Sequence, residues 1–238
     1  MFRKMLLGAA ALVAGTAVVA YAGPKDDVQA AVKKLADAPN YSWKNSSEGG
    51  QFNTSSEGKK DGDVTWTKTA FGDNEFESIR MGDKVVTKRG GEDWQAPDPN
   101  GGGGRRGGFG RGGGQAPAAQ AEQAIAAIPE FTKNGDVYTA TLTGDSVRAL
   151  MPFGRGGRRG GGGGDAGGNQ GPQITNGKAT YKITIKDGIP VKVESHISGS
   201  MNFNGNDIDL DRTTITEIKD VGKTKINIPA DAKAKLQG

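Results

Sequence analysis

The strict alternation of polar and apolar residues in the last third of the chain limits its fold more than any other feature. Between Lys178 and Lys186 every second residue is apolar, and the residues between them are lysine or threonine. A period of two is typical of a β-strand with one buried and one solvated face. The dipeptide Asp187-Gly188 follows at once and favours a two-residue turn. This segment therefore predicts an antiparallel hairpin.

Similar turn dipeptides divide much of the chain into short segments: Gly49-Gly50, Asp61-Gly62, Gly82-Asp83, Asn134-Gly135 and Asn204-Gly205. Around and between them the pattern predicts strands over residues 41–47, 51–57, 64–70, 75–81, 84–88, 92–95, 136–143, 178–186, 189–203, 208–218 and 223–228. The apolar parity slips between Leu210 and Ile215, which predicts a bulge or a twist there.

Helical spacing is confined to a few places. From Asp26 onward, apolar residues recur at helical spacing until Pro39 ends the pattern. Residues 118–128 and 145–151 predict two further helices, and a short helical tail follows Pro229. Many short strands joined by hairpins predict an α+β fold, in which one antiparallel sheet of about 10 or 11 strands curves strongly into a half-barrel. We expect the helices on its concave side, within a single domain over residues 23–238.

The first 22 residues have the pattern of a signal peptide. Arg3 and Lys4 precede the apolar run 5–19, and Ala20-Tyr21-Ala22 fits the rule for cleavage sites. The run is shorter than a comfortable membrane span, which argues against the alternative of a membrane anchor. We therefore expect cleavage after Ala22, a periplasmic or secreted location, and no transmembrane segment in the mature chain.

Two tracts, 101–114 and 154–171, hold 21 of the 40 glycines of the chain. Such sequences bury too little apolar surface to fold, so we expect disordered loops over 99–116 and 154–172. Without the leader and the tracts the chain carries a net charge of about −3, so its basic character belongs to the tracts. Their arginines are candidate contacts for a polyanion, and an anionic envelope surface suits an exported chain better than nucleic acid. These candidates are Arg105, Arg106, Arg111, Arg155, Arg158 and Arg159.

The chain offers little to catalysis or metal binding, since it has one histidine and no cysteine among 238 residues. His196 is predicted on the polar face of a strand, where Glu194 is its expected partner. The run Asp207, Asp209, Asp211 alternates with apolar residues, and Arg212 stands where a calcium loop needs glycine. We interpret this run as the acidic face of a strand, and we expect no catalytic residues, metal or cofactor.

Three segments, together with the helix after the leader, resemble the LolA/LppX-type lipoprotein-carrier superfamily: 84–94, 185–193 and 218–229. The resemblance extends over most of residues 25–236, apart from the glycine-rich tracts. It implies a curved antiparallel sheet that wraps around helices and encloses an apolar cavity for acyl chains. The chain has no cysteine for lipid attachment, which excludes an anchored lipoprotein and leaves a soluble carrier.

If this cavity exists, the apolar residues of the strands and of the second helix are its candidate lining, with ordinary core packing as the alternative for each. These candidates are Val64, Trp66, Ile125, Ile128, Tyr181, Ile183, Val193 and Met201. The sequence thus predicts an exported, non-enzymatic protein that sequesters or carries a lipid or another amphiphile. Two alternatives remain open: a module that binds a polyanion or a partner through the glycine-rich loops, and a structural envelope protein without a ligand.

Overall fold

The computed structural model describes residues 23–49, 53–72, 74–96, 115–151, 173–203 and 206–237. The predicted leader and both glycine-rich tracts lie outside these ranges. The expectations for the leader, the loops and their arginines therefore remain predictions.

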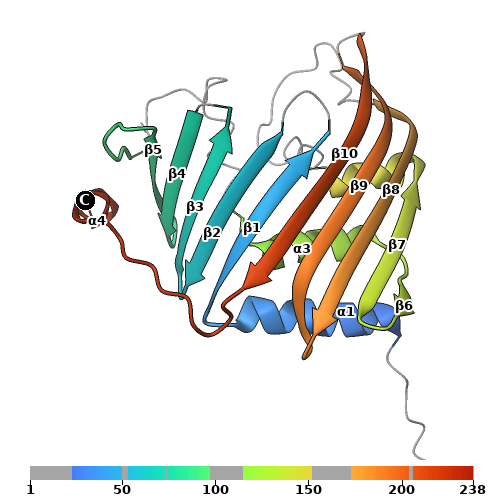
Figure 1. Ribbon diagram of the computed structural model, residues 1–238, viewed down its shortest axis with the longest axis horizontal. Helices are drawn as coiled ribbons and strands as arrows, with labels where there is room; N and C mark the ends of the chain where they lie inside the picture. Colours follow the sequence, from blue (N-terminus) through green and yellow to red (C-terminus); the bar gives the residue numbers. More distant parts are fainter. Residues whose placement is uncertain are drawn as a thin grey trace, which may run out of the picture.

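Ten strands form one antiparallel sheet in the order β5-β4-β3-β2-β1-β10-β9-β8-β7-β6 (Figure 1). The N-terminal meander comprises β1 (Asn40–Glu48), β2 (Thr54–Asp61), β3 (Val64–Phe71), β4 (Asn74–Met81) and β5 (Lys84–Arg89). The C-terminal meander comprises β6 (Thr132–Asn134), β7 (Val137–Thr143), β8 (Gln173–Lys186), β9 (Ile189–Phe203) and β10 (Asn206–Lys219). Each meander pairs strands that are neighbours in sequence, and the two are joined at the centre by β1 and β10.

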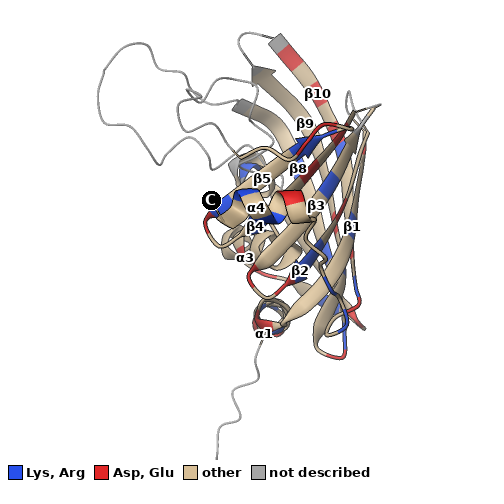
Figure 2. Ribbon diagram, turned by 90° about the vertical axis from the view of Figure 1, so that its left-hand side faces the viewer, with Lys and Arg blue, Asp and Glu red and all other residues tan. Residues whose placement is uncertain are grey.

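Helices α1 (Pro24–Asp37) and α3 (Pro117–Ala127) and the 3₁₀-helix η1 (Gly144–Leu150) share one side of the sheet, which we call the inner face. Figure 2 shows α1 and α3 on the same side of the strands. Helix α4 (Ala230–Gln237) lies beyond β5 instead (Figure 1). The structure confirms the α+β half-barrel with one curled sheet. No helix within the described ranges is long and apolar enough to span a membrane.

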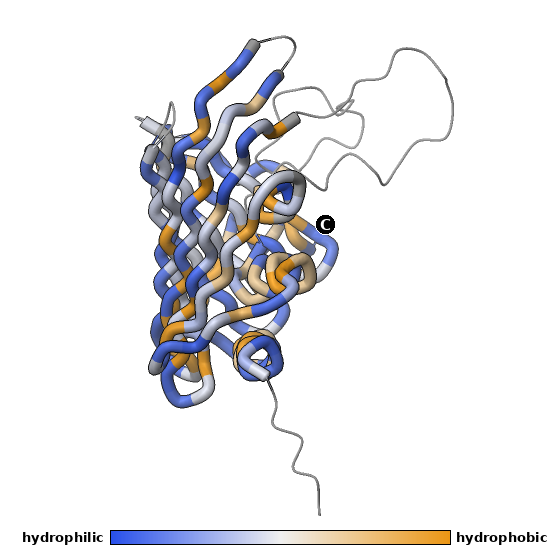
Figure 3. Tube along the Cα trace, turned by 90° about the vertical axis from the view of Figure 1, so that its right-hand side faces the viewer, coloured by the Kyte–Doolittle hydropathy of each residue, from blue (hydrophilic) through white to orange (hydrophobic). Residues whose placement is uncertain are grey.

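The largest apolar cluster lies between the inner face of the C-terminal meander and its helices. The strands supply the residues of this cluster from one face, because hydrophobic and hydrophilic residues alternate along them (Figure 3). Ile183 on β8, Val28 on α1 and Val147 on η1 are fully buried in this cluster. At about 25 cal/mol per Å² of buried apolar surface, this contact is the main force that holds the helices to the sheet.

A second cluster lies on the opposite, outer face, at the far end of the N-terminal meander. Ile79 on β4 and Val86 on β5 are fully buried there, beneath Trp94 and the α4 residues Ala232 and Leu236. Figure 2 shows α4 in front of this end of the sheet. The sheet therefore buries its inner face at one end and its outer face at the other.

Two cross-strand rows show where the buried face changes. On the inner face, the row from β10 to β5 is Ile218, Trp43, Gly58, Thr67, Ser78 and Thr87, and it passes from buried to exposed. On the outer face, the neighbouring row is Lys219, Ser42, Lys59, Trp66, Ile79 and Val86, and it passes from exposed to buried. The change falls near Gly58, where an added Cβ would run into the indole of Trp43.

Two expected strands are absent. In residues 92–95 only Gln95 makes an isolated bridge, with Thr87 of β5. Residues 223–228 alternate like a strand but pair with no strand of the sheet. Side chains hold this segment instead: Thr224 N donates to Asn40 Oδ1 at 2.8 Å, and Ile226 N to Asp61 Oδ2 at 3.3 Å.

Of the bulge or twist expected between Leu210 and Ile215, the bulge is wrong, because the pairing of β10 with β9 runs through this stretch without a shift. Two register shifts lie instead in β8, one between Thr184 and Ile185 and one between Thr175 and Lys178. There Asn176 has a positive φ of 54°, and a Cβ added to Gly177 would come within 2.8 Å of the Ile174 side chain and lie in ordinary contact, at 3.5 Å, with Val147 of η1. The bulge thus lets η1 rest directly on β8.

Candidate ligand-binding face

The inner face of the sheet has an apolar part and a polar part. The apolar part covers β7 to β9 and contains Tyr138, Tyr181 and Ile183 beneath the helices. Burial raises the pKa of Tyr181 on β8, and it raises the pKa of Tyr41 on the more distant strand β1 to about 12. Both hydroxyls therefore stay protonated at neutral pH.

Helix α3 covers this part with small side chains. Six of its eleven residues are alanine, and its buried residues include Ala118, Ala121, Ala124 and only one large aliphatic side chain, Ile125. Its neighbours are mainly α1 and η1, and it makes few close contacts with the strands. Since an alanine methyl buries little surface, α3 is attached more weakly than α1.

Five half-buried apolar side chains continue the cluster toward the end of the sheet, and we call them the apolar rim: Leu150, Met151, Met201, Ile208 and Leu210. Leu150 ends η1 and Met151 follows it, and both pack against the cluster, as does Leu210 on β10. Met201 on β9 pairs with Ile208 on β10 on one side and with buried Ile174 on the other. The rim is therefore the place where the inner apolar surface reaches solvent.

The polar part of the inner face lies on β10 and the N-terminal meander and is rich in hydroxyl groups. Ser47, Thr67 and Thr216 are buried there, with exposed fractions of 4 to 8%. Thr67 and Ser78 share a hydrogen bond of 2.7 Å across β3 and β4. An amphiphile that lay on this face would thus meet apolar side chains at one end and hydroxyls at the other.

Charge is divided between the two faces. In the described strands every carboxylate lies on the outer face by the register of the pairs, whereas the inner face carries cations. These inner cations are Lys60, Arg80, Arg89, Lys133 and Arg212. Arg212 lies at the border of the two parts, because its pair on β9 is buried Ile197 and its hydrogen-bond partner on β1 is Ser47.

Helix α1 is fastened to the sheet by polar contacts along its length. Near its start, Lys133 and Tyr138 each donate to Asp27 Oδ2, at 3.0 and 2.9 Å. These two bonds, Lys133 first, hold the pKa of Asp27 below its ordinary value. Near its end, Lys34 Nζ donates to the carbonyl of Asp187 in the β8–β9 turn at 2.9 Å. Helix α1 is therefore the fixed part of the cover.

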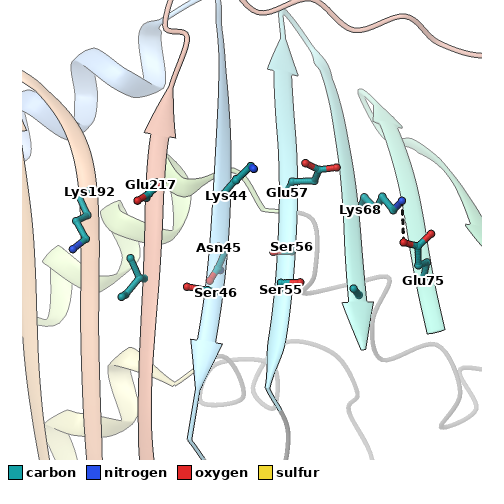
Figure 4. A pocket seen from close by; sticks show the side chains of 12 residues that line it. Lys44, Asn45, Ser46, Ser55, Ser56, Glu57, Lys68, Glu75, Lys192 and Glu217 are labelled. Atoms are coloured by element: carbon teal, nitrogen blue, oxygen red, sulfur yellow. Dashed lines mark ion pairs between the residues drawn. The ribbon is translucent and has the colours of Figure 1, made fainter. Parts of the chain in front are cut away.

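A shallow groove of about 580 Å³ crosses the outer face at the centre of the sheet (Figure 4). A row of alternating charge runs through it from β9 to β5, and its members are Lys192, Glu217, Lys44, Glu57, Lys68, Glu77 and Lys88. Lys219 beside Glu217 lowers the pKa of that carboxylate, and Lys192 and Lys44 add smaller effects. Because each charge has opposite neighbours, this groove has no strong preference for an ionic or an apolar ligand.

The structure separates the predicted cavity residues. Ile125, Ile128, Tyr181 and Ile183 meet in the inner cluster, and Val193 packs against it. Met201 lies in the apolar rim. Val64 and Trp66 do not join them, since both belong to the outer-face cluster under α4 and Trp94. Their alternation was interpreted correctly as one face of a strand, but at this end of the sheet that face is the outer one.

The polar motifs of the sequence lie on the outer face. His196 is exposed and its Nε2 lies 2.8 Å from Asp211 Oδ1, whereas the expected partner Glu194 pairs with Lys192 at 3.0 Å. Asp207 accepts a hydrogen bond from Asn202 at 2.8 Å. Within the described ranges, no three His, Asp or Glu side chains are gathered as ligands of a metal ion.

Sequence reasoning missed Arg212 and Ser47 as inner-face residues. The signal was present for Arg212, because Ile208, Leu210 and Arg212 have the same parity and hence share one face. For Ser47 it was weaker, since serine is common on either face of a strand. The arginines of the glycine-rich tracts, proposed for polyanion contacts, lie outside the described residues.

Comparison with known proteins gives a structural neighbour and no relative in sequence. No family model matches the chain, and no curated protein matches its sequence. The structure is similar to the crystal structure of the lipoprotein LppX of Mycobacterium tuberculosis, with a TM-score of 0.46. The alignment covers 87% of this chain and 98% of that chain at 9% sequence identity. This neighbour bears one of the names of the superfamily that the sequence resembles.

Proposed function

We propose that this chain is an exported, non-enzymatic binding protein that sequesters or carries an amphiphile on the inner face of its sheet. The observation that carries the proposal is the apolar rim, where the buried cluster of the C-terminal meander opens toward solvent. Contiguous apolar surface at a concave face is a common place for ligands. The hydroxyl-rich part next to it would leave a polar head group solvated or hydrogen-bonded.

The proposed binding mode places the acyl chain at the rim and under α3, which moves aside. The buried side chains of α3 are mainly alanines, which lowers the cost of its displacement. An acyl chain of about sixteen carbons gains on the order of 10 kcal/mol when it is buried, which offsets this cost. Ile125, Ile128, Tyr181, Ile183, Val193 and Met201 would then contact it, as the sequence proposed.

The first experiment asks whether any lipid binds. Mass spectrometry of organic extracts from the purified mature protein should detect a co-purifying amphiphile, and the delipidated protein should take up a fluorescent fatty acid. Repeated absence of both would contradict the proposal. Hydrogen exchange adds a test of the mode: the ligand should change exchange in residues 117–127 more than in residues 24–37, because α1 stays fastened.

A matched pair of variants locates the site. Ile208 and Ile215 are both half-buried on β10, but Ile208 lies on the inner face and Ile215 on the outer. Ile208→Asp should weaken uptake of the fatty acid by about tenfold or more, since it places a charge in the apolar rim. Ile215→Asp should leave uptake unchanged. Equal effects would show that the rim is not the site.

The export part of the proposal has its own support. If the leader is cleaved after Ala22, the new terminus is Gly23, whose nitrogen donates to Asp26 Oδ2 at 2.8 Å at the start of α1. Two aspartates in the first turn suit both the helix dipole and a new terminal ammonium group. N-terminal sequencing of the protein from the periplasm or the medium checks this: Gly23 as the first residue supports it, and an intact Met1 opposes it.

A further inference from the structure

The charges of the inner face bear on which amphiphile the protein prefers, and this inference rests on the proposed function. Arg212 is half-buried at the border between the apolar and the polar part. Its Nε donates to Ser47 Oγ at 2.5 Å. Within the described residues, no carboxylate lies within 4.0 Å of its guanidinium, and its terminal nitrogens donate to no protein group.

The surroundings of Arg212 hold it in place and leave its charge unbalanced. Ser47 is only 4% exposed and its Oγ lies 3.1 Å from Thr214 Oγ1, so the guanidinium is fixed by a buried hydroxyl that is itself held in place. The nearest acidic residue in sequence, Asp211, points to the outer face and contacts His196. A half-buried guanidinium without an acidic partner is costly unless something else neutralises it.

The other inner cations differ from Arg212. Lys133 is paired with Asp27, Lys60 donates to the carbonyl of Ala38, and Arg89 stacks on Phe76. Arg80 is exposed and lies on β4, far along the polar part. Arg212 alone among these five adjoins the apolar rim, because Leu210 precedes it by two residues on the same face, about 7 Å along the strand.

We propose that Arg212, held in place by Ser47, binds the anionic head group of the amphiphile together with Thr214, so that the protein selects a charged lipid over a neutral one. The planar guanidinium offers two parallel N–H donors that match a carboxylate or a phosphate. The absence of carboxylates from the inner face of the described strands removes repulsion there. The acyl chain then extends from Arg212 over Leu210 and the apolar rim.

Displacement of the uncharged dye Nile red from the mature protein at pH 8 provides the test, with hexadecanoate and hexadecanol as the competing ligands. We expect hexadecanoate to displace the dye at an at least roughly tenfold lower concentration than hexadecanol, as a charge-assisted pair predicts. Arg212→Gln should reduce this preference to less than about threefold and leave the affinity for hexadecanol unchanged. Arg212→Lys should keep part of it, because the charge remains.

Arg80→Gln is the matched control, since it removes an inner-face charge that does not adjoin the rim. It should keep the preference for hexadecanoate. A preference that survives in Arg212→Gln, or that Arg80→Gln abolishes equally, overturns the inference. Inorganic phosphate should not displace the dye at concentrations where hexadecanoate does, and displacement by phosphate alone would show a site for free anions instead.

The two proposals fail in different ways. If the protein takes up neither the dye nor hexadecanol, the proposed function itself is wrong. If both bind and hexadecanoate has no advantage, amphiphile binding stands and the role of Arg212 is wrong. Circular dichroism of each variant confirms that the fold is retained.

Discussion

The two meanders of the sheet are built alike and are buried differently. Each has five antiparallel strands, yet helices cover the inner face of the C-terminal meander, whereas α4 and Trp94 cover the outer face at the far end of the N-terminal meander. The inner face of the N-terminal meander is then free to be polar, and its hydroxyls continue the surface on which the helices rest. Because its two ends bury opposite faces, one sheet can have an inner face that is apolar at one end and polar at the other, without a charged group in its core.

The largest effects are expected from fully buried isoleucines at the two ends. Ile183→Ala in the inner cluster and Ile79→Ala in the outer cluster should each lower the free energy of unfolding by about 2–5 kcal/mol, since each leaves a cavity. Urea unfolding measures both. Only Ile183→Ala should also weaken uptake of a fluorescent fatty acid by the folded protein. If Ile79→Ala weakens it as much, the two ends do not have separate roles.

A smaller effect is expected where the buried face changes. Gly58→Val should destabilise the protein by about 1–3 kcal/mol, because the new side chain meets the indole of Trp43. Urea unfolding, followed by tryptophan fluorescence, measures the change. Gly91→Ala is the control, since Gly91 has open space around its Cα and no positive φ. Equal stability of Gly58→Val and the wild type would show that Trp43 does not mark this boundary.

The attachment of α1 to the C-terminal meander should depend on pH. The pKa of Asp27 is lowered by the bonds from Lys133 and Tyr138, so its stabilisation is present above the ordinary pKa of 3.8 and is lost as pH falls through the lowered value. Asp27→Asn should lower the melting temperature at pH 7 and approach the wild type in strong acid. Asp37→Asn, which removes only the exposed pair with Lys33, should have little effect. A constant difference between Asp27→Asn and wild type at every pH would contradict this account.

The smallest effect is expected on the outer face. Lys44→Glu places a third carboxylate between Glu57 and Glu217 in the row of alternating charge. The melting temperature should fall by a few degrees at most, and the fall should shrink in high salt, because these side chains are exposed to solvent. Fatty-acid uptake should not change. A loss of uptake would mean that the outer groove takes part in binding.

The sequence predicted the strands better than their surroundings. Alternation over 64–70 shows that Val64 and Trp66 share a face, but it does not show which face is covered, because the cover comes from Trp94 and from α4, some 170 residues later in the chain. The same limit explains residues 223–228, whose pattern fits a strand although they pair with no strand of the sheet. Alternation is a local property, whereas coverage depends on contacts between distant segments.

The candidate site was predictable in part for the same reason. Tyr181, Ile183, Ile125 and Ile128 share one buried cluster, because strand and helix periodicity placed each on the apolar side of its element, and their contact with a ligand stays a prediction. Arg212 was considered only as the residue that spoils a calcium loop. Its importance became visible when the register placed it opposite Ile197 and next to Ser47, which is 165 residues away in sequence.

The central pairing of β1 with β10 has a consequence for how the chain folds. Ser42 pairs with Lys219, so the seam between the meanders closes only after nearly the whole chain has emerged. Local hairpins form early, and contacts of such long range form late and slowly. Until then β1 and β10 each expose an unpaired strand edge that can pair with the other strand. At high concentration, two molecules can satisfy these edges by exchanging halves, so a domain-swapped dimer is the expected misfolded form.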